Sequence, residues 1–287
     1  MRYRWLALIV MFAVASLCAI MINRGSNDFK AFNAQAEGQP AEGKVVPVLV
    51  ELFTSEGCSS CPPADEMLAR LESTQPVAGA QVITLSEHVD YWNRLGWTDP
   101  YSDAEFSARQ SQYAGRFHRE DVYTPQMVVD GRAEFVGSNV SRAREAITAA
   151  LQSPKASVSV SIGRDATNQS VRTRDAQIPL VIRVENLPTI SANDTAEVLL
   201  AITESDLRSE VSRGENSGRS LRHTSVVRRL SQVGSVDLKK GDAFDALPVV
   251  RVEKVWKREN LKAVVFVQER ASRRVLGVAS IALGAKE

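Results

Sequence analysis

The spacing of hydrophobic residues changes along this chain, and the change predicts two kinds of structure. In residues 45–152, apolar runs that suit buried strands alternate with segments of helical period, and turn residues separate them. The expected strands are 45–53, 81–89, 122–131 and 132–136, and the expected helices are 63–72, 102–118 and 139–151. This order of strand, helix, strand, helix, hairpin and helix is typical of an α/β layer arrangement.

Polar and apolar residues alternate with period two from Ser157 onward. The alternation is strict over 157–162, and comparable runs follow at 180–184, 196–203, 225–230, 247–252 and 263–269. Several short strands with turns between them favour a β-sandwich. We therefore expect a first domain over residues 45–152 and an all-β, sandwich-like domain over residues 155–287.

The first 44 residues follow neither pattern. Arg2 and Arg4 precede a nearly unbroken apolar run that ends at Ile22. This run predicts a signal peptide or an apolar membrane-anchor helix over residues 1–22, with a polar linker over residues 23–44. The positive flank places the remainder outside the cytoplasm. We expect a periplasmic or secreted protein, held at the inner membrane by the N-terminal segment if the leader is not cleaved.

Composition narrows the range of functions. The chain has 35 Lys and Arg residues against 34 Asp and Glu residues, for a formal net charge of +1, so no basic excess favours a nucleic-acid partner. No phosphate loop or dinucleotide motif is present in the sequence, and we expect no cofactor. Cys18 lies in the apolar leader run, which leaves two cysteines in the exported part.

Those two cysteines, Cys58 and Cys61, are three residues apart on a predicted turn from strand to helix. Such a pair favours thiol–disulfide exchange, in which Cys58 attacks as the nucleophile and Cys61 resolves the mixed disulfide. Pro62 and Pro63 predict that the helix begins beside Cys61, since proline is tolerated in a first turn. The positive end of the helix would then lie near both sulfurs and favour a thiolate.

Three carboxylates close to the pair oppose that effect. Glu56, Asp65 and Glu66 are expected to raise the thiol pKa, although Asp65 and Glu66 also complement the dipole of the helix.

Other uses of the cysteine pair stay open. Cys58, Cys61 and His88 could hold a soft metal ion such as Cu(I), since thiolates select it. His88 could alternatively act as a proton shuttle or bond within its own loop. The pair could also be a structural disulfide in a binding or assembly protein.

Three stretches of sequence carry a resemblance to a known family. They are Glu51–Asp65 with the cysteine pair, His88–Pro100 with its aromatic residues, and Tyr123–Gly131 with Thr124-Pro125. They resemble the DUF1223 family, an uncharacterised group of predicted secreted thioredoxin-like proteins, from Val45 to the C-terminus. The resemblance implies a thioredoxin-like fold for the first domain.

The thioredoxin resemblance also implies two roles around the cysteines. Pro125, preceded by Thr124, would form a cis peptide bond and shape the docking surface opposite the cysteine pair. Glu51 would accept the proton of Cys61, although its spacing to Cys58 is one residue longer than in thioredoxins; otherwise it is a solvated strand residue. Thr124 and Pro125 open a hairpin whose turn is expected at Asp130-Gly131.

Several further side chains have both a functional and a structural interpretation. Tyr91, Trp92 and Trp97 could form an apolar lip over the thiols or pack in a core. Ser102 is expected to cap the helix that follows it. The Gly-rich loop 213–219 is expected to be a solvated hairpin rather than a binding loop.

The leading hypothesis is an exported thiol–disulfide oxidoreductase that acts on protein thiols or disulfides. A periplasmic copper or soft-metal chaperone and a non-catalytic assembly protein remain the alternatives. The sequence does not indicate the direction of electron flow.

Overall fold

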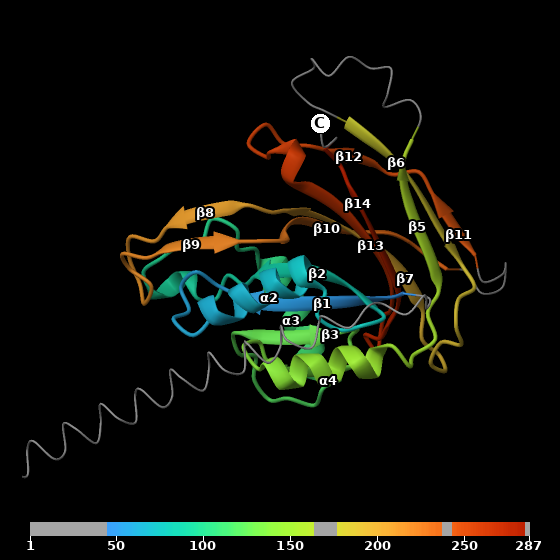
Figure 1. Ribbon diagram of the computed structural model, residues 1–287, viewed down its shortest axis with the longest axis horizontal. Helices are drawn as coiled ribbons and strands as arrows, with labels where there is room; N and C mark the ends of the chain where they lie inside the picture. The colour runs from blue at the N-terminus through green and yellow to red at the C-terminus, as the bar shows by residue number, and fades with distance from the viewer. Residues whose placement is uncertain (1–44, 164–176, 237–242, 285–287) are drawn as a thin grey trace, which may run out of the picture.

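The computed structural model describes residues 45–163, 177–236 and 243–284. Its largest part is a mixed sheet of eight strands (Figure 1). In spatial order the strands are β14 (Val275–Ala282), β13 (Leu261–Glu269), β7 (Ala196–Glu204), β10 (Val226–Ser235), β2 (Ala80–His88), β1 (Val46–Thr54), β3 (Gln126–Val129) and β4 (Ala133–Val136). The sheet curls, so that the Val275 N–H donates a hydrogen bond to the Asp130 carbonyl at 2.9 Å.

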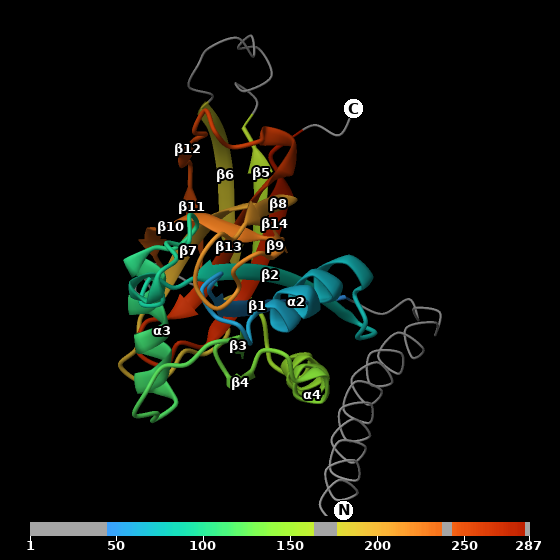
Figure 2. The same ribbon diagram turned by 90° about the vertical axis from the view of Figure 1, so that its left-hand side faces the viewer.

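Helices cover both faces of this sheet near β1 (Figure 2). α2 (Pro62–Thr74) and α4 (Val140–Ala150) pack on one face, and α3 (Ala104–Arg116) lies against the other. Because strand residues alternate between faces, Leu52 joins the core with α2, whereas Phe53 contacts Tyr113 of α3. Short 3₁₀ turns occur at Asn93–Leu95 and Arg258–Asn260.

The rest of the face shared by α2 and α4 is covered by a second, smaller sheet. It consists of β5 (Ser157–Ile162), β6 (Gln177–Glu185), β11 (Phe244–Ala246) and β12 (Val249–Arg251). Its inward residues, such as Ile182, pack on Val198 and Val265 of the large sheet. A separate hairpin, β8 (Leu207–Glu210) and β9 (Ser220–His223), extends toward α2 (Figure 1).

The prediction of a thioredoxin-like α/β domain followed by an all-β sandwich was wrong. The described chain is mostly β, and strands from both segments form one sheet, because β10 pairs in parallel with β2 at Val226 and Ser86. The Ser86 N–H also donates to the Ser225 carbonyl at 2.8 Å. Without β10, β2 would present an open edge. Alternation along a sequence identifies a strand but does not identify the strand beside it.

The predicted N-terminal helix and linker fall on residues 1–44, outside the described residues. Among the residues that are described, no helix has the length and apolar character needed to cross a membrane.

The predicted positions of individual helices agree better with the structure than the predicted domain arrangement does. The three described α-helices lie where the helical period predicted them, and α2 begins at Pro62 with Cys61 as its N-cap. Asp103, rather than the expected Ser102, caps α3 by accepting the Glu105 N–H at 2.8 Å.

The predicted turn at Asp130-Gly131 is confirmed, with positive φ angles of 49° and 62°. A Cβ atom at Gly131 would lie 1.7 Å from the Arg273 carbonyl oxygen, so a side chain cannot be accommodated there. The hairpin turn therefore packs directly on the turn between β13 and β14.

Candidate functional site

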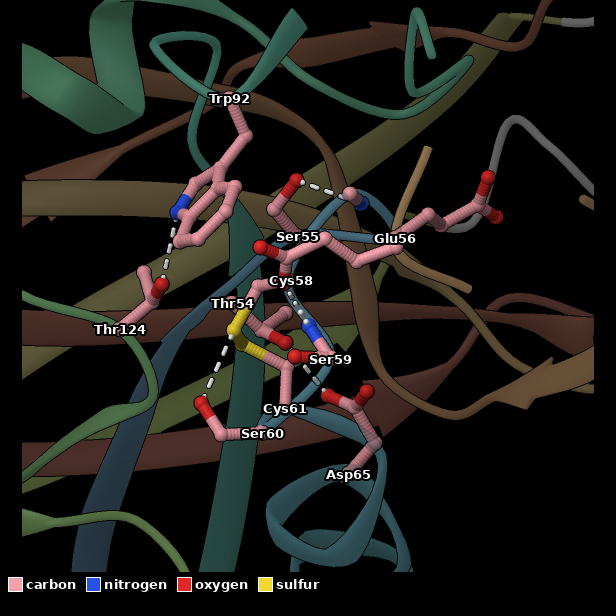
Figure 3. Close-up of a disulfide and its surroundings, with 12 residues drawn as sticks. Thr54, Ser55, Glu56, Cys58, Ser59, Ser60, Cys61, Asp65, Trp92 and Thr124 are labelled. Atoms are coloured by element: carbon pink, nitrogen blue, oxygen red, sulfur yellow. Dashed lines mark hydrogen bonds between the residues drawn. A yellow bond between two sulfur atoms is a disulfide. The ribbon is translucent and has the colours of Figure 1, made fainter. Parts of the chain in front are cut away.

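Cys58 and Cys61 form a disulfide where β1 passes into α2 (Figure 3). Both cysteines are fully buried, whereas Ser59 and Ser60 between them are exposed. The Ser60 hydroxyl lies 3.4 Å from Cys58 Sγ. The start of the helix at Pro62 places both sulfurs at its positive end, as the sequence predicted.

Thr124 lies near the disulfide (Figure 3), and the peptide bond between Thr124 and Pro125 is cis. The Trp92 indole N–H donates to the Thr124 hydroxyl at 2.8 Å, and this pair lies on the other side of the disulfide from Asp65 (Figure 3). A Cβ atom at Gly137 would lie 3.0 Å from Ala64 Cβ in α2 and 3.3 Å from Pro125 Cβ. The ring of Pro125 thus lies close to the first turn of α2.

Glu51 is not part of this arrangement. Its carboxylate lies on the α3 side of β1, 2.5 Å from an Arg109 nitrogen and 2.5 Å from the Tyr113 hydroxyl, which donates to it. The residue that faces α2 is the next one, Leu52. Glu51 is fully buried, so it is neither a solvated strand residue nor placed to take a proton from Cys61.

Asp65 is the carboxylate that the structure places near Cys61. It lies one helical turn after Cys61, and its Oδ1 accepts a hydrogen bond from the Thr54 hydroxyl at 2.8 Å (Figure 3). Burial of the carboxyl group raises the pKa of Asp65 to about 6, although His223 and His88 oppose the shift. Asp65 also lines a cavity of about 770 Å³, whose other lining residues come from α2, β9 and the turns beside β9.

Two buried imidazoles lie behind the cysteine turn. His88 Nδ1 is 2.7 Å from Asp99 Oδ2, His223 Nε2 is 3.0 Å from Glu56 Oε1, and the two rings are 4.9 Å apart. Burial disfavours a charged His88, but the Asp99 carboxylate outweighs it and raises the pKa of His88. The other ring nitrogens, His88 Nε2 and His223 Nδ1, have no hydrogen-bond partner among the described residues.

The set of metal ligands considered from the sequence does not come together. His88 is bonded to Asp99, and the sulfurs of Cys58 and Cys61 are bonded to each other. Within residues 45–163, 177–236 and 243–284, no three His, Cys, Asp or Glu side chains are grouped in a way that could hold a metal ion.

The Gly-rich loop 213–219 joins β8 to β9 and is exposed except at Asn216, as expected of a solvated hairpin. It packs on the cysteine turn: the side-chain amide of Asn216 donates to the carbonyls of Glu56 and Cys58, each at 2.9 Å. The Glu215 carboxylate accepts the Ser59 N–H at 3.0 Å. Asn216 is fully buried by these contacts.

Two of the three aromatic residues of the second stretch also belong to the site. The Trp97 indole N–H donates to Glu56 Oε2 at 2.8 Å, and Trp97 packs on Gly214 of the loop. Trp92 bonds Thr124, whereas the Tyr91 hydroxyl donates to Gln110 of α3. These contacts connect the three stretches that carried the family resemblance with one loop from the second half of the chain.

The family described as "Protein of unknown function (DUF1223)" matches residues 49–268. The chain belongs to this family. The region of the DUF1223 match contains the cysteine pair, the cis peptide bond, both histidines and the loop with Asn216, so every part of the site described above lies within it. No curated protein matches the chain.

Two solved structures resemble this DUF1223 protein. Protein AGR_C_4864 from Agrobacterium tumefaciens is 28% identical, with a TM-score of 0.62 over 86% of this chain and 98% of that one. HBP35 of Porphyromonas gingivalis is 12% identical, with a TM-score of 0.57 over 85% of this chain and 77% of that one. The second likeness concerns the fold alone.

Proposed function

We propose that this protein exchanges disulfides with protein thiols through Cys58 and Cys61. The observation that carries the proposal is the disulfide at the first turn of α2, beside the Thr124–Pro125 cis bond. A helix N-terminus favours a thiolate, and the attacking species in disulfide exchange is a thiolate.

The reaction follows from the positions of the two sulfurs. In the reduced protein the Cys58 thiolate attacks one sulfur of a substrate disulfide, forms a mixed disulfide and releases the first substrate thiolate. The Cys61 thiolate then attacks Cys58 Sγ, which releases the second substrate thiolate and restores the Cys58–Cys61 bond. Two electrons pass to the substrate, and the reverse sequence oxidises a substrate dithiol.

Asp65 takes the role that the sequence had suggested for Glu51. Cys61 must lose its proton before it attacks, and a base with a pKa near the working pH is the most effective acceptor. The raised pKa of Asp65, about 6, and its position one turn along α2 from Cys61 suit that step. Glu51 instead holds α3 to the sheet through Arg109.

The apolar leader favours action outside the cytoplasm, in the periplasm or after secretion, where disulfides persist. A protein substrate would approach over the exposed Ser59 and Ser60, while the half-buried Thr124 and Trp92 shape the adjoining surface and Pro125 lies buried beneath it.

The test is a redox titration of the full chain in glutathione buffers, read by thiol alkylation. We expect a reversible two-electron transition within roughly −100 to −300 mV, the span of known exchangers. The Cys61→Ser variant should accumulate a mixed disulfide at Cys58, and the Cys58→Ser variant should not. A pair that stays oxidised throughout would overturn the proposal and favour a structural disulfide in an assembly protein.

A further inference from the structure

A second cavity, of about 770 Å³, lies on the α3 face of the large sheet. Its lining residues come from α3, strands β7 and β10, and the turn between β13 and β14. It shares no lining residue with the surroundings of the disulfide. Its size falls within the roughly 300–1,000 Å³ of small-molecule sites.

Arg273 is the unusual residue of this cavity. Its side chain is only 7% exposed, and its Nε has no hydrogen-bond partner. The guanidinium makes one long contact, 3.5 Å from Nη1 to the Arg270 carbonyl, and stacks over the Tyr113 ring. Among the described residues, no carboxylate lies within ion-pair distance of Arg273. A buried cation without a counter-ion is costly, so this position is suited to an anion.

Neighbouring carboxylates do not supply the missing charge. Glu51 forms an ion pair with Arg109, and Glu197 forms one with Arg270, in which Oε1 lies 2.5 Å from Nε. Burial raises the pKa of Glu87 well above its usual value, and the cation that Glu87 approaches is Arg109, at 3.4 Å. Glu105 also lines the cavity, but it is exposed on the first turn of α3 and makes no ion pair with Arg273.

The floor of the cavity is apolar. Leu199 and Leu230, each 8% exposed, line it there, and the exposed Ala108 and Ala271 line it nearer solvent. Arg116 adds positive charge at the rim, with its Nε bonded to the Ser272 carbonyl at 2.6 Å. A ligand that matches both the arginines and the leucines carries an anionic group at one end and a hydrocarbon part at the other.

We propose that this cavity binds a small organic carboxylate, with its carboxylate on the Arg273 guanidinium and its apolar part over Leu199 and Leu230. Arginine presents a planar fork of donors that matches a carboxylate. The proposal does not depend on the thiol chemistry of the cysteine pair.

Calorimetric titration of the full chain with hexanoate, acetate and inorganic phosphate, at matched ionic strength, tests it. We expect saturable hexanoate binding that is about tenfold tighter than acetate binding, because of the added hydrocarbon. Arg273→Met should weaken hexanoate binding about tenfold or more. The control Arg183→Met removes an exposed arginine outside the cavity, which is paired with Asp245, and should leave binding unchanged.

A second variant tests the cavity without changing the buried Arg273. Ala108→Glu, on the exposed side of α3, puts a carboxylate at the mouth of the cavity and should weaken hexanoate binding about tenfold. No saturable binding by wild type, equal binding by a folded Arg273→Met variant, full binding by Ala108→Glu, or phosphate binding tighter than hexanoate binding would each overturn the proposal.

Discussion

Two buried polar clusters lie on either side of β1, and they differ in kind. On the α3 side, Glu51 is bonded by Arg109 and Tyr113, and Arg109 also donates to Gln268 of β13. This cluster ties α3 to strands from both halves of the chain.

Near the disulfide, by contrast, two groups have raised pKa values. Asp65 has a pKa of about 6, the pKa of His88 is raised, and ring nitrogens are left without partners. The comparison teaches that carboxylates near one another along the sequence serve different purposes according to the face they reach. Glu51 is suited to stability, and Asp65 is suited to proton transfer.

The largest expected effect breaks the first cluster. Glu51→Gln removes the nearer of the two carboxylates that contact the buried Arg109 guanidinium and leaves only Glu87, at 3.4 Å, so it should lower the free energy of unfolding by about 3–5 kcal/mol. Urea denaturation measures the loss. The matched control Glu145→Gln, which disrupts an exposed pair with Arg142, should change stability by less than about 1 kcal/mol. If the folded Glu51→Gln protein had an altered redox potential, Glu51 would influence the cysteine pair, which contradicts a purely structural role.

The second prediction removes the proposed proton acceptor. Asp65→Asn should slow release of the Cys58 mixed disulfide by about a hundredfold. In wild type the rate should rise with pH through about 6, as Asp65 ionises, and this inflection should vanish in the variant. Stopped-flow measurements from pH 5 to 8 follow the step, with the exposed neighbour Glu66→Gln as control. An unchanged pH profile in Asp65→Asn would mean that another group takes the proton.

The substitution Asp65→Asn, which should slow the reaction, should also make the folded protein more stable at alkaline pH. Because the pKa of Asp65 is raised above the unfolded value of 3.8, the folded protein holds the proton more tightly than the unfolded chain, and stability falls as pH rises through about 6. Asp65→Asn should therefore be more stable than wild type at pH 8, by about 1–2 kcal/mol once solvent access to the side chain is allowed for. A protein that is less stable at pH 8 after the substitution would contradict the raised pKa.

The last prediction tests the loop that packs on the cysteine turn. Asn216→Ala removes two buried hydrogen bonds and should lower the free energy of unfolding by about 1–3 kcal/mol. Reduction of the disulfide by dithiothreitol should become several-fold faster, since the turn is less firmly held. Ser217→Ala, in the same loop, removes an exposed hydroxyl that donates to the Ser212 carbonyl, and it is the control. Equal reduction rates in both variants would show that the loop does not restrain the disulfide.

The parts of the site that are local in sequence were predictable, and those that depend on distant contacts were not. The helix start at Pro62 and the turn at Asp130-Gly131 follow from the conformational limits of proline and glycine. Alternation along β1 separates Glu51 from Leu52, but the sequence does not show which face α2 covers. Nothing in the residues around Asn216 indicates that its partners lie at Glu56 and Cys58.

The pairing of β10 with β2 also sets an order of events during synthesis. Ser86 meets Ser225, and the cysteine turn meets Asn216, only after most of the chain has left the ribosome. Until then the edge of β2 is unpaired and the two thiols lack their covering loop. Contacts of such long sequence separation slow folding and prolong exposure to aggregation. Until the sheet closes, Cys58 and Cys61 therefore lack the contacts with Asn216 that bury their turn in the folded protein.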